Sequence, residues 1–447
     1  MNTPILSLVP LRAALLASPD AVGHVLIRVT APEAPISAPR RTPLHVALVI
    51  DRSGSMSGQP LEEAKRCATF VVAGLRADDR ASLVVYDNHV NVLAPANTIG
   101  DGEELRRSIA AIHSGGQTNL HGGWFKGAET LAPHDADGVL SRVILLSDGC
   151  ANEGLTDEAA IAKQCAELAA SGVTTSTYGL GRNFNESLMQ AMARSGGGNA
   201  YYGATADDLM DPFREELALL SALVARQMRL HLEPAPGIEI QVLNNYQSTG
   251  SSAWRLPDLA YGAEAWAVVR IRVSKEVLDH AGSLPIQILT ARVTGTDFDG
   301  HALLLEPTTL AIPAVAGSTY ESLAENELVR RRLQEVEAAR SAEAARSAAG
   351  RGDWARVDQL LESLRKRVHD SPWLTGVVRE LEGLAARRDE LGFSKETLYA
   401  SLRMDNRLAA SYEAPSPTAT DVPDYLRRKL AQGKAAAPRT DRTEGNQ

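Results

Sequence analysis

The chain has 447 residues, of which 44% are hydrophobic and 23% charged, a composition typical of globular proteins with two or three domains. Its net charge of −9 argues against a dedicated nucleic-acid surface, because phosphate binding needs a concentrated basic patch. No apolar run approaches the roughly 18 residues of a membrane span. The first twenty residues lack a basic start and contain Pro4 and Pro10, so we interpret them as mature sequence rather than a signal peptide. Three cysteines without a CxxC pair favour a reducing compartment, and we expect a cytoplasmic protein.

The first patterned segment is HVLIRVTA (24–31), which alternates apolar and polar residues like a strand with one exposed face. Segments of the same character return after residue 226, at 237–245, 265–274 and 284–295. In the second of these, Val269, Ile271 and Val273 alternate with arginines. We therefore expect residues 1–42 to pair with 226–313 in an antiparallel, sandwich-like β domain, with another unit inserted between them.

Residues 43–223 alternate strand-like and helix-like segments, which predicts an α/β domain with a doubly wound, mostly parallel sheet. The expected strands are 45–51, 81–87, 90–95, 141–149, 173–181 and 199–203. The expected helices are 60–75, 102–112, 119–132, 157–172, 186–198 and 207–223. Ligands of such sheets gather beyond the carboxyl ends of the strands, where Asp51 and Asp148 lie.

Three segments at these strand ends offer oxygen atoms. DRSGS presents Asp51, Ser53 and Ser55, the glycine-rich SGGQTNL presents Thr118, and LLSDG presents Asp148. Two carboxylates and three hydroxyls, with no nitrogen or sulfur, suit Mg²⁺ first and Ca²⁺ or Mn²⁺ second. Gly54, Gly115 and Gly116 fit a close approach of the backbone to a small ion.

This set of residues resembles the metal-ion-dependent adhesion site of the von Willebrand factor A (VWA) domain family, whose pattern is DxSxS, then a threonine, then an aspartate after a later strand. The resemblance covers about residues 43–223. It implies that Ser53, Ser55 and Thr118 are direct or near-direct ligands and that Asp51 and Asp148 act through water. The flanking β region also resembles bacterial multidomain A-domain proteins and, loosely, inter-alpha-trypsin inhibitor heavy chains.

The resemblance implies a non-enzymatic interaction module or scaffold, in which the ion holds an acidic residue of a partner protein. Two alternatives remain open: a metal-dependent hydrolase using the same ion, and an accessory subunit of an ATP-driven (AAA-type) machine. Cys150 has no sequence signal for a catalytic histidine partner, so we do not interpret it as a nucleophile.

The remaining regions are interpreted without a specific activity. Residues 318–411 are predicted to be a helical domain, with Asp353 and Ser371 as helix N-caps; a plain bundle is favoured over tetratricopeptide-type hairpins. Residues 412–447 are predicted to be disordered. We expect Trp124 and Phe125 in the core, with the rim of the site as the alternative. His121 is expected on a helix surface near the site, and turns are expected at 134–138 and 296–300.

Overall fold

The computed structural model describes residues 3–33, 43–131, 139–148, 151–181, 184–203, 205–282 and 284–405. This part of the chain falls into two compact units, one ending at Leu333 and one formed by Gln334–Asp405. None of the helices within these ranges is long and apolar enough to cross a membrane. The tail predicted at 412–447 lies outside the described residues, as do the turn predicted at 134–138 and Cys150.

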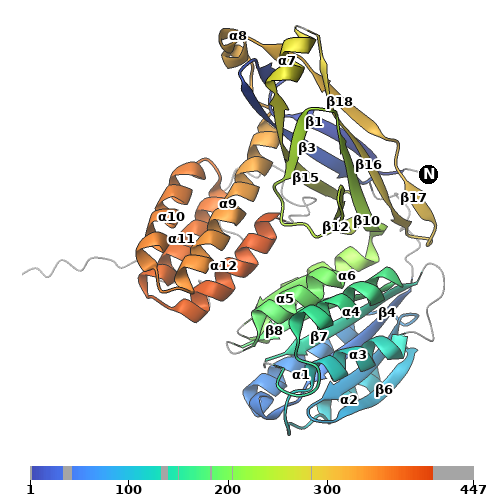
Figure 1. Cartoon of the computed structure of the whole chain (residues 1–447). Coiled ribbons are helices and arrows are strands. Elements are labelled where there is room, and N and C mark those ends of the chain that lie inside the picture. Colours follow the sequence, from blue (N-terminus) through green and yellow to red (C-terminus); the bar gives the residue numbers. More distant parts are fainter. Residues whose placement is uncertain are drawn as a thin grey trace, which may run out of the picture. The chain divides into compact units, whose positions relative to one another are not determined.

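A mixed, mostly parallel sheet forms the centre of the α/β domain (Figure 1). Its strand order is β6-β5-β4-β7-β8-β9, and only the β5–β6 pair is antiparallel among these strands. The strands are β4 (Leu44–Asp51), β5 (Arg80–Tyr86), β6 (Val90–Thr98), β7 (Leu140–Ser147), β8 (Val173–Leu180) and β9 (Gly197–Gly203). The predicted α/β fold class is therefore confirmed.

Helices cover both faces of this sheet (Figure 1). On one face α1 packs beside α2 and α6, and on the other α3 lies on β4, β5 and β7 while α4 packs beside α5. Their bounds are α1 (Gln59–Gly74), α2 (Glu103–Ala110), α3 (Leu120–Leu131), α4 (Glu158–Ala170), α5 (Glu186–Ser195) and α6 (Ala206–Ser221). Because β4 is covered from both sides, every residue of its apolar run is buried.

The order of the strands creates a crevice at the carboxyl ends of β4 and β7. The chain leaves β4 to form β5 on one side, and later returns to form β7 on the other side. The connections diverge at this point, so a ligand can lie between the loops. Asp51 ends β4, and Asp148 directly follows β7.

The β domain has two antiparallel sheets around one apolar core. The first sheet has the order β1 (Ile5–Pro10), β3 (Asp20–Thr30), β15 (Glu264–Ser274) and β11 (Ile238–Val242). Strand β3 pairs with β15 along its whole length, from Asp20 opposite Ser274 to Thr30 opposite Glu264. Val269, Ile271 and Val273 of β15 are fully buried, as their alternation with arginines predicts.

The second sheet has the order β12 (Ser248–Gly250), β13 (Ala253–Arg255), β10 (Leu223–Pro234), β16 (Ile286–Asp297) and β17 (Ala302–Leu304). Strands β14 (Leu259–Ala260) and β18 (Thr308–Ile312) pair with β10 and β16. A separate short parallel pair joins β2 (Leu15–Leu16) to β19 (Ala314–Val315). The helices of this region are α7 (Lys275–Ala281) and α8 (Gly317–Ser322).

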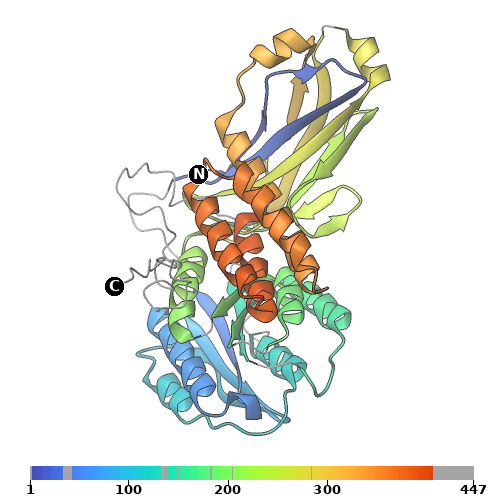
Figure 2. The same cartoon turned by 90° about the vertical axis from the view of Figure 1, so that its left-hand side faces the viewer.

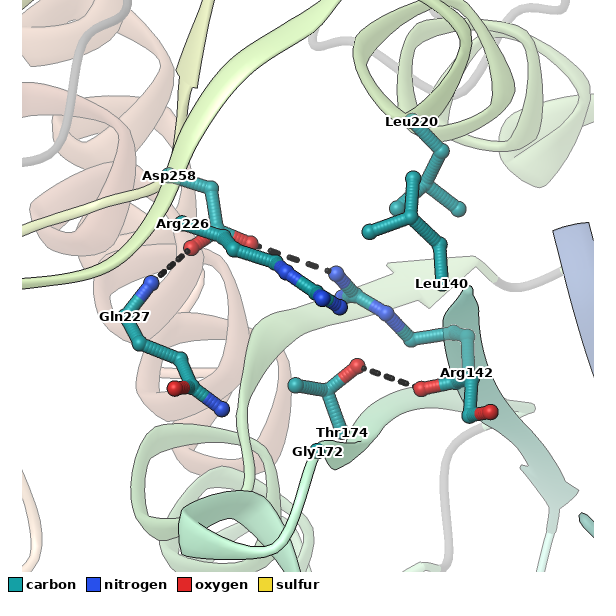
Figure 3. Close-up of a pocket in the computed structure, with 9 residues that line it drawn as sticks. Leu140, Arg142, Gly172, Thr174, Leu220, Arg226, Gln227 and Asp258 are labelled. Carbon is teal, nitrogen blue, oxygen red and sulfur yellow. Dashed lines mark hydrogen bonds and ion pairs between the residues drawn. The ribbon is translucent and has the colours of Figure 1, made fainter. Parts of the chain in front are cut away.

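A polar junction joins the α/β domain to β10 at the amino ends of β7 and β8 (Figure 3). Arg142 of β7 lies with its guanidinium 2.7 Å from Glu216 of α6 and 3.6 Å from Asp258. Gln227, a non-glycine residue with φ of 54°, donates its backbone N–H to Asp258 at 3.1 Å. A small hollow, partly open to solvent and lined by Arg142, Gln227 and Asp258 among others, lies at this junction. It is at the opposite end of the strands from Asp51 and Asp148.

The second unit is a bundle of antiparallel helices, seen side by side in orange and red in Figure 2. It comprises α9 (Glu327–Ala349) from Gln334 onward, α10 (Trp354–Arg367), α11 (Pro372–Ala386) and α12 (Glu390–Asp405). Asp353 and Ser371 accept hydrogen bonds from the first turns of α10 and α11, so both predicted N-caps are confirmed.

Candidate metal centre

The five residues expected to bind a cation lie at the end of β4 and on three loops at the carboxyl edge of the sheet. They are Asp51, Ser53, Ser55, Thr118 and Asp148, and we call them the oxygen cup. Asp51 is fully buried, while Ser53, Thr118 and Asp148 keep 1%, 3% and 8% of their surface exposed. Ser55 is exposed, so the cup opens to solvent at this hydroxyl.

Direct hydrogen bonds connect four residues of the cup. Asp51 Oδ1 accepts the backbone N–H of Ser53 at 2.8 Å, and the Ser53 and Ser55 hydroxyls are 3.1 Å apart. The Ser55 hydroxyl then donates to Asp148 Oδ1 at 3.0 Å. The short 3-10 turn η1 (Gly54–Met56) makes this possible, because it turns Ser53 and Ser55 toward the same side.

Thr118 joins the cup through its loop. Gly54 donates its N–H to the carbonyl of Gly116 at 2.9 Å, and Gly115 donates to the carbonyl of Arg52 at 2.8 Å. The loop therefore packs directly against the Ser53–Ser55 segment. Gly116 has a φ of 74°, where a side chain would be strained, so the turn of the loop itself requires glycine at this position.

The two carboxylates are held in an environment that disfavours their charge. Burial raises the pKa of Asp51 above its ordinary value, although hydrogen bonds from Ser53 and Ser147 oppose the shift. Burial, and then the nearby charge of Asp51, raise the pKa of Asp148 to about 6. Arg52 is close in sequence, but its guanidinium forms an ion pair with Asp87 at 3.1 Å. A cation would relieve the unfavourable burial of both carboxylates.

The donor set fits a hard divalent cation. All five side chains offer oxygen, which Mg²⁺, Ca²⁺ and Mn²⁺ prefer over nitrogen or sulfur. Asp51 is additionally fixed by the Ser147 hydroxyl, which donates to its Oδ2 at 2.7 Å. Ser147 was not expected from the sequence, although its position directly before Asp148 in LLSDG is a signal that could have found it.

The neighbouring aromatic residues behave differently from one another. Trp124 is fully buried and donates its indole N–H to Thr175 at 2.9 Å, as expected of a core residue. The prediction of a core position for Phe125 is wrong, since its side chain is 40% exposed. The next position along α3 is turned by about 100°, which takes Phe125 away from the sheet. His121 is half-buried and contacts Gln164 at 2.7 Å.

A second group of possible ligands lies far along the chain. Asp297, Asp299 and His301 have ligating atoms within 4.8 Å of one another in the turn between β16 and β17. Asp297 accepts the backbone N–H groups of the other two residues, which is ordinary turn geometry and confirms the predicted turn.

Comparison with known proteins identifies the type of the α/β domain. Residues 45–215 match the sequence profile of the von Willebrand factor type A domain. An uncharacterized protein of Synechocystis is 29% identical over 208 residues, covering 46% of this chain and 48% of that protein. Mouse inter-alpha-trypsin inhibitor heavy chain H3 is 26% identical over 191 residues, covering 39% of this chain and 21% of that protein. The matches thus span less than half the length of these relatives.

Solved structures extend the likeness over more of the chain. A von Willebrand factor type A protein of Catenulispora acidiphila aligns with a TM-score of 0.65 and 15% identity, covering 91% of this chain and 97% of that one. The ArnB paralog VWA2 of Sulfolobus acidocaldarius aligns with a TM-score of 0.59 and 19% identity, covering 89% and 99%. At these identities the likeness shows the fold alone. Residues 45–215 are a VWA domain.

Proposed function

We propose that the oxygen cup holds a divalent cation, most readily Mg²⁺, and that this ion binds an acidic side chain of a partner protein. The protein would then be a metal-dependent interaction module. The observation that carries this proposal is a series of hydrogen bonds of 2.8, 3.1 and 3.0 Å, which links Asp51, Ser53, Ser55 and Asp148 in this order. It gathers oxygen donors from two separate strand ends around one point.

The residues of the cup have distinct tasks in this proposal. Ser53, Ser55 and Thr118 offer neutral hydroxyl oxygens, and Asp51 and Asp148 supply negative charge. Asp51 is fully buried, so it acts from beneath the hydroxyls rather than at the surface. A bound cation would offer an open coordination position to a carboxylate of the partner protein. Neutral hydroxyl ligands do not cancel the charge of the ion, so the ion still attracts a carboxylate of the partner strongly.

The comparisons support the general part of this proposal, which is a role in protein–protein interaction. VWA domains typically mediate protein–protein interactions, and residues 45–215 match that domain. We extend this to the whole chain by assigning partner binding to residues 43–223 and a scaffold role to the β region (226–313 with 1–42) and the helices (318–411). Cys67 and Cys165 are buried free thiols, in keeping with a proposed cytoplasmic location.

The test is a pull-down with the full chain as bait, in Mg²⁺ and in excess chelator, with mass spectrometry of the proteins released. We expect a partner that is captured only with the cation and is lost with Ser53→Ala and Thr118→Ala. Ser171→Ala is the matched control, since this hydroxyl only bonds carbonyls at the end of α4. Partner binding that is unchanged in chelator would contradict the proposal.

Two outcomes would redirect it. Turnover of phosphoester or peptide substrates with Mg²⁺ or Mn²⁺, abolished by Asp148→Ala, would identify a hydrolase. Capture of an AAA-type ATPase, retained in chelator, would identify the accessory-subunit alternative.

A further inference from the structure

Two asparagines from different loops hold the Thr118 loop. Asn88 lies between β5 and β6, and its Oδ1 accepts the backbone N–H of Gln117 at 2.9 Å. Asn152 lies between β7 and α4, and its Oδ1 accepts the backbone N–H of Thr118 at 2.9 Å. Two consecutive backbone amides are thus bound by side chains that are far apart in the sequence.

The segment that contains Asn152 also binds the carbonyl group of Thr118. The carbonyl of Thr118 accepts the backbone N–H groups of Asn152 at 3.2 Å and Glu153 at 3.3 Å. Both backbone polar groups of Thr118 are therefore satisfied from the segment that follows Asp148. This links the position of one hydroxyl of the cup to the loop that carries one of its carboxylates.

Asn88 packs so closely on the loop that only glycine fits beneath it. A Cβ atom built on Gly116 would lie 2.1 Å from Asn88 Oδ1, well inside the contact distance of two heavy atoms. The positive φ of Gly116 and its close contact with Asn88 therefore both require glycine at this position. The loop lies outside any helix or strand, so its backbone N–H groups lack the usual backbone acceptors. Side-chain oxygens accept these N–H groups instead.

We propose that Asn88 and Asn152 are positioning residues that set Thr118 in its place before a cation binds. This inference rests on the proposed metal site and adds to it two residues that the pattern DxSxS–Thr–Asp does not include. Each side chain acts through the backbone of its neighbour, not by touching the ion. A carboxamide is suited to this task, because its oxygen accepts the N–H without adding a third negative charge near Asp51 and Asp148.

The test measures binding of Mn²⁺ alone, by electron paramagnetic resonance of the free ion, to the full chain and its variants. Groups that orient metal ligands typically contribute ten- to a hundredfold to affinity. We expect Asn88→Ala and Asn152→Ala each to weaken Mn²⁺ binding about tenfold. Asn88→Asp and Asn152→Asp keep the acceptor oxygen, so each should bind Mn²⁺ within about threefold of wild type or more tightly.

Asn185→Ala is the matched control. Its Oδ1 also accepts a backbone N–H, from Leu188 at 3.1 Å, but as the N-cap of α5. It should lower the melting temperature and leave Mn²⁺ affinity unchanged. Alanine variants at Asn88 and Asn152 that bind Mn²⁺ within twofold of wild type, while Ser53→Ala does not bind, would overturn this inference and leave the metal site standing. If Ser53→Ala also binds normally, the metal site and this inference both fail.

Amide hydrogen exchange of the wild type gives an answer even if the alanine variants do not fold. The N–H groups of Gln117 and Thr118 should be protected equally without and with Mn²⁺, because the asparagines hold them before the ion arrives. Protection that develops only on addition of Mn²⁺ would show that the ion, and not the asparagines, orders the loop.

Discussion

Replacing Glu216 by alanine removes the acceptor at the centre of a buried polar cluster in the α/β domain. Glu216 is 1% exposed and lies on α6. Its Oε1 is 2.7 Å from Arg142 and accepts the Ser176 hydroxyl at 2.6 Å. Its Oε2 accepts the Asn199 amide at 2.6 Å and the Tyr201 hydroxyl at 3.0 Å. One carboxylate thus joins α6 to β7, β8 and β9.

The expected cost follows from what is left behind. Arg142 is 2% exposed, and among the described residues it would keep only Asp258, at 3.6 Å, as a counter-charge. Removing one partner of a buried ion pair costs about 3–5 kcal/mol, so we expect Glu216→Ala to lower the free energy of unfolding by about 4 kcal/mol. Glu216→Gln keeps an acceptor but loses the charge, and should cost about 2 kcal/mol.

Urea unfolding of the full chain, with deuterium exchange of β7 and β8 as the local readout, measures this cost. Glu167→Ala is the control, because Glu167 is 63% exposed and 3.9 Å from Lys163 on α4. An exposed pair of this kind contributes under about 0.5 kcal/mol. A loss below about 1 kcal/mol in Glu216→Ala would refute the reasoning, since it would mean that Arg142 is not held by this carboxylate.

Three further predictions concern the α/β domain. First, burial and the charge of Asp51 raise the pKa of Asp148 to about 6. The carboxyl group of Asp148 therefore binds its proton more tightly in the metal-free folded state than in the unfolded chain. The resulting stability is complete below the unfolded pKa and is lost as pH rises through about 6. Chemical denaturation at several pH values should therefore show wild type losing stability relative to Asp148→Asn between about pH 4 and 6, the interval between these pKa values. A constant difference would contradict this. Second, burial raises the pKa of Cys67 to about 12 and that of Cys165 further still. Iodoacetamide followed by peptide mapping should label neither thiol until the domain unfolds, and rapid native labelling would show that the helices open. Third, a Cβ on Gly127 would lie 2.3 Å from Val49 Cγ2. Gly127→Ala should cost about 1–3 kcal/mol in thermal unfolding, and an unchanged melting temperature would show that α3 can move away from β4.

The strands that carry the cup were predictable because their apolar runs are long and end at an acid. β4 and β7 are covered on both faces, so their sequences need no alternation, and this pattern is recognisable without a structure. Parallel strands bring their carboxyl ends to one edge, which places Asp51 and Asp148 together. The prediction for Thr118 needed the resemblance to a known family, since a threonine before a helix is also an ordinary cap.

The supporting residues could not be predicted in the same way. Asn88 and Asn152 bind backbone N–H groups 29 and 34 residues away, and a backbone N–H leaves no mark in the sequence. Glu216 and Arg142 are 74 residues apart, and each alone would be assigned to a solvated surface. Local patterns predict which face of an element is apolar, but not which distant polar group it meets.

The error at Phe125 has a different cause. An aromatic residue beside Trp124 in an apolar helix favours a core position, yet a helix on a sheet buries only one stripe. The glycines at 123 and 127 mark that stripe, because α3 must approach the sheet closely there: a Cβ on Gly123 would lie 2.3 Å from the ring of Tyr86. Taking these glycines as the packed face would have placed Phe125 outside it.

Isothermal titration of the metal-free full chain with Mg²⁺ tests the central claim most directly. We predict binding of one ion per chain in the wild type and no measurable binding in Ser53→Ala, with an unchanged response in Ser171→Ala. Equal heats of binding for wild type and Ser53→Ala would contradict the claim that the oxygen cup holds a divalent cation.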